Sequence, residues 1–147
     1  MFEQSVAGEV GRDHRHVFPR AVRFADIDSL GHVNNVRFLD YLEDARLAMF
    51  HADPHREGLA RFQGLVIARH EIDYRRPLTF RLDPVRVESW VTEIRTARFT
   101  LAYEIRDDDE IFVRAGSVLV AYDVERASPR RLNPDELAYL RRFTTGG

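Results

Sequence analysis

The sequence predicts an α+β domain in which an antiparallel sheet wraps around one long helix. A single long helical pattern, with apolar residues three or four positions apart, follows the first strand-like segment. The later segments alternate apolar and polar residues and follow one another as hairpins. The helical segment is apolar over more than half of its circumference. This pattern fits a helix enclosed by a curved sheet better than a helix on a surface.

The first half of the chain contains an arm, one strand and the helix. Residues 1–14 show no clear periodicity and are expected to form a loose N-terminal arm before a single domain of residues 15–147. The first strand is predicted at about residues 15–24, and the helix at about residues 35–51. Pro54 is expected to end the helix, because its ring excludes a further intrahelical hydrogen bond. The apolar residues on one face of the strand are Phe18, Val22 and Phe24.

The second half of the chain alternates more regularly. One strand is predicted to present on a single face Val66, Ala68, His70, Ile72 and Tyr74. Pro77 ends this strand or lies at its edge. Further strands are predicted at about residues 85–92, 98–106 and 111–124. A closing helix at residues 135–143 follows Asn133 as the N-cap and Pro134 as its first helical residue.

Composition excludes several classes of protein. The chain has no cysteine, which excludes disulfides, zinc–thiolate sites and thiol catalysis. All 22 basic residues are arginine, which excludes a lysine Schiff base, and the net charge of −2 gives no case for nucleic acid. The histidines lack partner ligands, so no metal site is expected. There is no membrane-length apolar run and no signal-peptide pattern, so we expect a cytoplasmic protein that does not bind membranes.

Polar residues gather in the ten positions from Asp26 to Asn35, between the first strand and the helix. Asp26 and Asp28 are two positions apart at a strand end, so both are expected to point to one side. Asn34 or Asn35 can cap the helix, which leaves its first N–H groups available to an anion or a polarised carbonyl oxygen. A carboxylate facing a helix N-terminus is the minimal set of groups for attack on an acyl group.

These residues resemble a known signature. The pattern D-x-D-x-x-G-H-V-N-N, followed by F-x-x-Y-x-E-x-A-R at residues 38–46, is similar to that of hotdog-fold acyl-CoA thioesterases. The nearest group is named after 4-hydroxybenzoyl-CoA thioesterase. Residues 71–78, Glu-Ile-Asp-Tyr-Arg-Arg-Pro-Leu, resemble the second characteristic strand of that family, and the resemblance covers about residues 15–143. It implies the hotdog fold, a curved antiparallel sheet around one long central helix.

The resemblance also implies an activity. The chain is expected to be an acyl-CoA thioesterase, a hydrolase that cleaves a neutral fatty- or aryl-acyl-CoA to the free acid and coenzyme A. No cofactor is needed, and coenzyme A enters only as part of the substrate. Family members pair their subunits with the active sites at the interface, so a homodimer or homotetramer is expected. Two alternatives remain open: a non-hydrolytic acyl-binding hotdog protein, and a related dehydratase or isomerase.

The catalytic candidates come from the same signature. Asp28 matches the catalytic aspartate of the family, although aspartate after a strand also forms Asx turns. The backbone N–H of Asn35 matches the position that polarises the thioester carbonyl. His32 is interpreted either as a general base or orienting donor, or as an ordinary loop histidine. Glu43 is the second candidate carboxylate, and its alternative is an ion pair with Arg46 one turn away.

The predicted substrate contacts surround these groups: Gly31, Val33, Asn34, Phe38, Tyr74, Arg75 and Arg76. Gly31 supplies a backbone shape or lets a ligand approach closely, and the two arginines are expected to meet the phosphates of coenzyme A. His70 and Tyr74 are interpreted as core residues, with pocket lining as the alternative. Asp26 is expected to stabilise the loop as a hydrogen-bond acceptor. No basic residue clearly faces inward, which favours a neutral acyl group.

Overall fold

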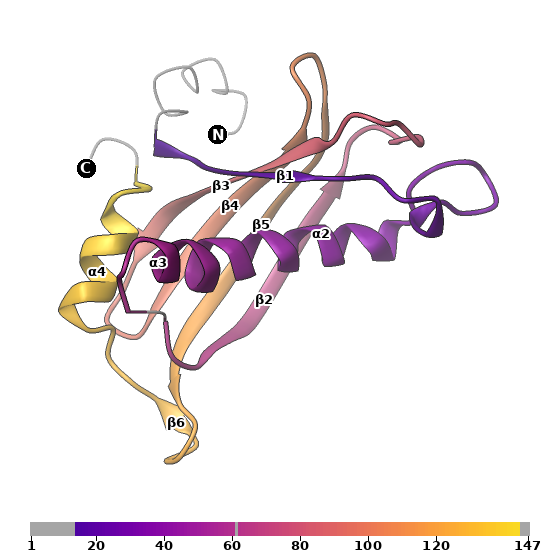
Figure 1. Ribbon diagram of the computed structural model, residues 1–147. Coiled ribbons are helices and arrows are strands. Elements are labelled where there is room, and N and C mark those ends of the chain that lie inside the picture. Colours follow the sequence, from indigo (N-terminus) through magenta and orange to yellow (C-terminus); the bar gives the residue numbers. More distant parts are fainter. Residues whose placement is uncertain (1–13, 61, 145–147) are drawn as a thin grey trace.

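The computed structural model describes residues 14–60 and 62–144. Its strands are β1 (His16–Arg20), β2 (Leu65–Tyr74), β3 (Val85–Ile94), β4 (Arg98–Arg106), β5 (Ile111–Asp123) and β6 (Ser128–Pro129). They pair antiparallel in the order β1-β3-β4-β5-β2, and β6 pairs with β5. The long helix α2 (Asn35–Leu47) lies across one face of this curved sheet (Figure 1). The predicted α+β architecture of the hotdog type is confirmed.

Helix α2 is held on the sheet by one apolar face. Its buried residues are Phe38, Tyr41, Leu42 and Ala45. They lie three or four positions apart, so they form one stripe along the helix. The stripe packs in the same core as the inward residues of β3, β4 and β5, among them Val87, Leu101, Ile105 and Val113. Each large apolar side chain buried there contributes about 1.5–3 kcal/mol, which fixes where the helix N-terminus lies.

The end of α2 differs from the prediction. The chain does not leave the helix at Pro54 but passes through a π-helical turn, Ala48–Ala52, into the short helix α3 (Asp53–Arg56). Pro54 lies in the first turn of α3, where a backbone N–H has no intrahelical partner to lose. The prediction that Pro54 ends the helical segment is therefore wrong.

The first strand is shorter than predicted. β1 ends at Arg20, and residues Phe24–Asp26 form a 3₁₀ turn. The turn breaks the alternation of the strand, so Phe24 is 78% exposed while Val22 remains buried. Phe24 stacks on Phe80 instead of entering the core. The placement of Phe24 on the buried face is wrong for this reason.

Strand β2 contains an irregularity that the sequence does not reveal. His70, Ile72 and Tyr74 pair with residues of β5 whose side chains face the helix, as predicted. The register shifts between Ile67 and Arg69, so Val66 lies on the opposite face of the sheet from His70. The predicted single face from residue 66 to residue 74 is therefore wrong at its N-terminal end.

The closing helix α4 (Pro134–Arg141) begins as predicted. The Asn133 side chain accepts from the Glu136 N–H, and the Glu136 side chain accepts from the Asn133 N–H, which is a capping box. α4 lies beside the C-terminal end of the long helical segment (Figure 1), where the Tyr139 hydroxyl donates to the Met49 carbonyl. None of the helices in residues 14–60 and 62–144 is long and apolar enough to cross a membrane.

Candidate active site

A cleft of about 420 Å³ opens where the loop before α2, the first turn of α2 and the end of β2 meet. Its lining residues are Asp28, Leu30, His32, Val33, Asn34, Asn35, Phe38, Tyr74, Arg75, Arg76 and Pro77. The structure therefore brings together every residue predicted for the site except Gly31 and Glu43. The lining combines one carboxylate, a helix N-terminus, two arginines and an apolar wall.

The loop is closed by its own backbone. The Asp28 N–H donates to the His32 carbonyl at 2.8 Å, and the Gly31 N–H donates to the Asp28 carbonyl at 3.0 Å. Gly31 has a φ of +83°, which L side chains rarely adopt, and a Cβ on it would have no heavy atom within 4 Å. Of the two roles open for Gly31, the structure supports the backbone conformation.

The loop is also joined to the segment that follows β2. The Val33 N–H donates to the Leu78 carbonyl at 2.7 Å, and His32 forms a β-bridge with Thr79. This segment comes directly after Arg75 and Arg76, so both sides of the cleft are connected by backbone hydrogen bonds. The His32 ring lines the cleft and has no hydrogen-bond partner among the described residues.

Asp28 is half-buried, and its carboxylate is oriented by the loop. Oδ1 accepts from the Leu30 N–H at 2.9 Å and from the His32 N–H at 3.2 Å. The Asx-turn interpretation of Asp28 is therefore correct, and it coexists with a position in the cleft. Oδ2 has no donor among the described residues, so one oxygen is fixed by the backbone and the other is left for a ligand.

The helix N-terminus opens into the same cleft. Asn34 is the N-cap, and its Oδ1 accepts from the Val36 N–H at 2.9 Å. The Arg37 N–H donates to the Asn34 carbonyl. The N–H of Asn35 has no acceptor within residues 14–60 and 62–144, and the helix dipole adds positive potential there.

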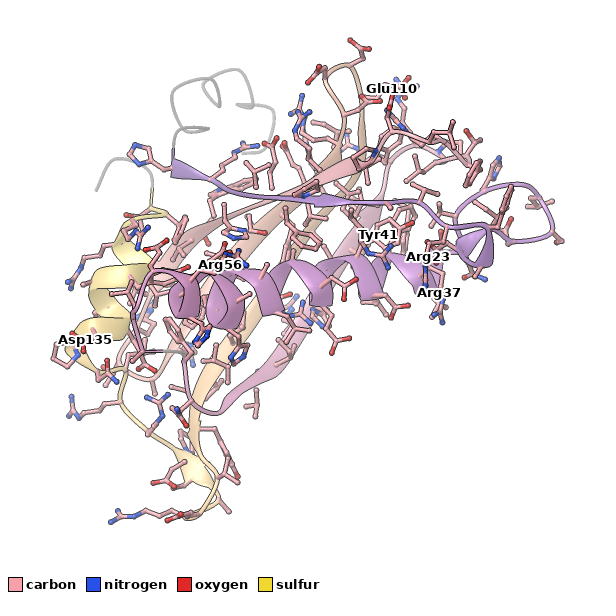
Figure 2. All side chains as sticks on the ribbon, viewed as in Figure 1. Arg23, Arg37, Tyr41, Arg56, Glu110 and Asp135 are labelled. Carbon is pink, nitrogen blue, oxygen red and sulfur yellow. The ribbon has the colours of Figure 1, made fainter. Side chains whose placement is uncertain are left out.

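Asp26 lies outside the cleft and stabilises the loop, as predicted. It is 1% exposed and accepts from the Tyr41 hydroxyl at 2.8 Å and from the Arg23 backbone N–H and side chain at 3.0 Å each. Burial opposes ionisation of this carboxyl, but these hydrogen bonds outweigh it and keep the pKa of Asp26 below its usual range. Figure 2 shows Arg23 and Tyr41 near the N-terminal half of α2. The prediction that Asp26 and Asp28 point to one side is wrong, because the 3₁₀ turn separates their directions.

The end of β2 forms the other wall of the cleft. The Tyr74 hydroxyl donates to the Asn35 carbonyl at 3.3 Å, and the Tyr74 ring lies 6.0 Å from that of Phe38. Tyr74 is 46% exposed, so its interpretation as a core residue is wrong and the pocket-lining alternative is correct. Arg75 and Arg76 are exposed, and their nearest carboxylate contacts are long, 3.8 and 3.9 Å.

Two other interpretations are wrong, the ion pair of Glu43 with Arg46 on α2 and the core position of His70 on β2. Glu43 is exposed and lies outside the cleft lining, and it forms no ion pair with Arg46. Arg46 instead donates to the Tyr103 hydroxyl on β4 at 3.1 Å. His70 is exposed rather than in the core, and its Nδ1 lies 2.7 Å from the Ser117 hydroxyl. The one signal in the sequence for the contacts of Arg46 and Ser117 is Tyr103, a residue with a hydroxyl at an apolar position of β4.

No metal centre accompanies the cleft. Within the described part of the chain, no group of three or more histidine, aspartate or glutamate side chains is placed to hold a metal ion. The cleft lining offers a carboxylate oxygen beside a helix N-terminal N–H.

Comparisons with known proteins give the family and the fold. A family model described as the thioesterase-like superfamily matches residues 22–140. The chain is similar to a thioesterase from Thermus thermophilus solved with coenzyme A and Zn, with 29% identity, a TM-score of 0.71, and 86% of this chain and 92% of that chain covered.

Two further solved structures show the same fold at lower identity. One is a predicted thioesterase from Bacillus stearothermophilus, with 22% identity, a TM-score of 0.76, and coverage of 88% of this chain and 96% of that chain. The other is a 1,4-dihydroxy-2-naphthoyl-CoA thioesterase from Synechocystis, with 21% identity, a TM-score of 0.73, and coverage of 86% and 96%. The curated proteins contain no match to the chain.

Proposed function

The chain belongs to the thioesterase-like superfamily, and from this premise we propose that it hydrolyses acyl-CoA thioesters in the cleft beside Asp28. Membership gives the reaction class, thioester hydrolysis. One observation carries the rest of the proposal: Asp28, whose Oδ2 has no donor among the described residues, and Asn35, whose N–H has no acceptor there, line the same cleft. In the proposed reaction, Asp28 is the nucleophile or base and the Asn35 N–H is the donor for the oxyanion.

The carbonyl group of the thioester binds with its oxygen toward the Asn35 N–H. As the carbonyl carbon becomes tetrahedral, negative charge develops on that oxygen, and the N–H together with the helix dipole stabilises it. The carbon–sulfur bond then breaks, and coenzyme A leaves as the thiol after its sulfur takes a proton. Asn34 contributes by capping Val36, which keeps the first turn of α2 in place.

Asp28 has two possible parts in this reaction. In one route, its Oδ2 removes a proton from a water molecule whose oxygen attacks the carbonyl carbon, and the proton passes to the leaving sulfur. In the other, Oδ2 itself attacks and forms a mixed anhydride, which water hydrolyses in a second step. Both routes need a carboxylate whose second oxygen is held, and the Leu30 and His32 N–H groups hold Oδ1.

The remaining walls of the cleft fit the two halves of the substrate. Arg75 and Arg76 are exposed beside the cleft and are engaged only by long ion pairs, so they are available to the phosphates of coenzyme A. Phe38 and Val33 supply an apolar surface next to the thioester. We assign a neutral fatty or aryl group to this side of the cleft.

The proposal is tested by measuring release of coenzyme A thiol from a panel of acyl-CoA thioesters. Turnover of at least one fatty- or aryl-acyl-CoA is expected without added metal or redox cofactor. Binding of acyl-CoA with no release from any member of the panel would instead support a non-hydrolytic acyl-binding protein.

Substrate size gives a second expected result. Each methylene buried against the apolar wall contributes about 0.8 kcal/mol, so kcat/KM should rise by roughly fourfold per added carbon until the wall ends. Succinyl- and malonyl-CoA should be poor substrates, because their carboxylates would lie against Phe38 and Val33. The measurement is kcat/KM from acetyl- to palmitoyl-CoA, and a flat profile would contradict enclosure of the acyl chain.

We also propose that two copies of the chain associate through β2 and the outer side of α2. β2 is the last strand of the sheet and pairs on one edge only, and unpaired edges favour association unless covered. The exposed apolar residues on α2 and β2 include Val36, Leu39, Leu47, Val66 and Ile67. An apolar surface of this kind, next to a free strand edge, fits a second copy of the same chain.

Light scattering should therefore give twice or four times the 17.1 kDa mass of the chain. Replacing Leu47 by glutamate places a charge on the proposed interface and should shift the protein toward the monomer. Leu82→Glu is the matched control, because Leu82 is 89% exposed and belongs to neither β2 nor α2. A monomeric wild-type chain with full turnover would contradict a site shared between two copies.

A further inference from the structure

A chain of four polar side chains crosses the space between α2 and the sheet. Arg46 on α2 donates from Nη1 to the Tyr103 hydroxyl on β4 at 3.1 Å, and Tyr103 donates to the Ser117 hydroxyl on β5 at 2.8 Å. Nδ1 of His70 on β2 lies 2.7 Å from the same hydroxyl. Tyr103 and Ser117 are fully buried, Arg46 is half-buried and His70 is exposed. Solvent therefore reaches the two end residues of the polar chain but not its two middle residues.

The direction of these hydrogen bonds decides which N–H groups remain available on Arg46 and His70, at the two ends of the polar chain. A guanidinium group only donates, so Tyr103 accepts from Arg46 and gives its own proton to Ser117. Ser117 then continues the series by donating to Nδ1 of His70, which leaves the His70 proton on Nε2. Burial and the Arg46 charge both lower the pKa of His70, so its ring is neutral at pH 7. His70 therefore presents an N–H outside the polar chain.

Arg46 has N–H groups without an acceptor among the described residues. No aspartate or glutamate in the described part of the chain forms an ion pair with Arg46, and its Nε and Nη2 have no acceptor there. Glu43, one turn earlier on the helix, is exposed and forms no ion pair with Arg46. A half-buried cation without a carboxylate, linked through Tyr103 and Ser117 to a neutral histidine, is suited to an oxygen acceptor from outside. We call Arg46 and His70 together the polar pair.

The polar pair is aligned with the cleft. His70 and Tyr74 share the inward face of β2 with Ile72 between them, and four residues of strand separate them by about 13 Å. On α2, Asn35 and Arg46 lie on the same side of the helix, about 16 Å apart. Both elements thus lead from the thioester position to the polar pair over the length of a medium-chain acyl group.

We propose that Arg46 and His70 bind an oxygen substituent at the far end of the acyl group, so that the preferred substrate is a medium-chain acyl-CoA with a terminal hydroxyl. This inference rests on the proposed function and narrows it. Arg46 also corrects the sequence-based expectation that no basic residue faces inward. A hydroxyl accepts from both donors and keeps the acyl group neutral, whereas a terminal carboxylate would have to lose its hydration beside the apolar helix face.

The test compares ω-hydroxydecanoyl-CoA with decanoyl-CoA, which differ by one oxygen. The wild-type protein should favour the hydroxylated substrate about tenfold in kcat/KM, the size expected for hydrogen bonds at a half-exposed site. Arg46→Met and His70→Leu should each lower this ratio to about one. Arg69→Met is the matched control, because Arg69 adjoins His70 on the opposite face of β2, and it should keep the ratio.

Three results would overturn the inference: equal kcat/KM for the two substrates, a ratio that survives in both variants, or a higher kcat/KM for the dicarboxylic decanedioyl-CoA. Light scattering of Arg46→Met adds a readout of assembly. An unchanged mass with a lost ratio supports substrate binding, whereas conversion to a monomer with the ratio kept would assign Arg46 to a contact between copies.

A measurement of substrate binding tests the role of the polar pair independently of hydrolysis. If no acyl-CoA is hydrolysed, the proposed function fails, and calorimetry on the Asp28→Asn protein still decides the role of the polar pair. A Kd about tenfold lower for ω-hydroxydecanoyl-CoA than for decanoyl-CoA supports it, and equal values overturn it.

Discussion

Replacing Asp28 by asparagine is expected to lower kcat for thioester cleavage by about 100-fold or more. Asparagine has the same size, and its side-chain oxygen can still accept from the Leu30 and His32 N–H groups, so the loop keeps its shape. The variant loses the second carboxylate oxygen, which acts as nucleophile or base in either route. Because the Asn35 N–H and the cleft walls remain, binding of acyl-CoA should persist. Steady-state thiol release at saturating substrate measures the effect.

Glu43→Gln is the matched control for this prediction. It is the same kind of substitution, on the helix that follows the loop, and Glu43 is exposed and outside the cleft, so kcat should change by less than about threefold. Thermal unfolding of both variants checks that they fold. An inactive Glu43→Gln protein together with an active Asp28→Asn protein would show that the carboxylate has been assigned wrongly.

Removing the Asp26 carboxylate by Asp26→Ala is expected to have the largest effect on stability, about 3 kcal/mol. The substitution leaves the buried Tyr41 hydroxyl without its acceptor and takes two hydrogen bonds from Arg23. For a chain of 147 residues this corresponds to a fall in Tm of about 10 °C. Asp40→Ala is the control: among the described residues Asp40 pairs with Arg37 alone, at the surface, so this substitution should cost less than about 0.5 kcal/mol. Equal losses in both variants would contradict a special role for Asp26.

The stabilisation by Asp26 should depend on pH in one direction. Its pKa is lower in the folded state than the usual value of 3.8, so the folded state favours the ionised form. Its contribution is fully present above about pH 4 and is lost as the pH falls toward the folded-state pKa. Urea unfolding of wild type and Asp26→Ala should show a wide gap near pH 7 that narrows near pH 3. A gap that widens in acid would contradict the ionised state of Asp26.

Much of the fold could be predicted because local patterns and tertiary packing agree. In β4, Phe99, Leu101, Tyr103 and Ile105 alternate without interruption and all four are buried, as their spacing implies. The Asn133 cap of α4 is likewise a local signal that the structure follows. The site loop was found because its carboxylate, glycine and asparagines lie within ten residues of one another, so their proximity did not depend on the rest of the fold.

The errors arise where one residue changes the direction of the chain. The irregularity in β2 between Ile67 and Arg69 reverses the face of Val66, and nothing in the apolar alternation marks it. The 3₁₀ turn at residues 24–26 exposes Phe24 in the same way. The Arg46–Tyr103 contact joins residues 57 positions apart, so a helix-only argument paired Arg46 with Glu43 instead.

The hydrogen bonds that join the site loop to residues 78 and 79 have a mechanical consequence. Val33 and His32 are tied to Leu78 and Thr79, and this segment continues from the arginines beside the cleft. The backbone segments that carry Asp28 and the two arginines are therefore coupled through these hydrogen bonds. In the proposed reaction, binding of the coenzyme A phosphates at Arg75 and Arg76 positions the thioester beside Asp28. A distortion of residues 78 and 79 is therefore expected to displace the loop of Asp28 and the segment of Arg75 and Arg76 together.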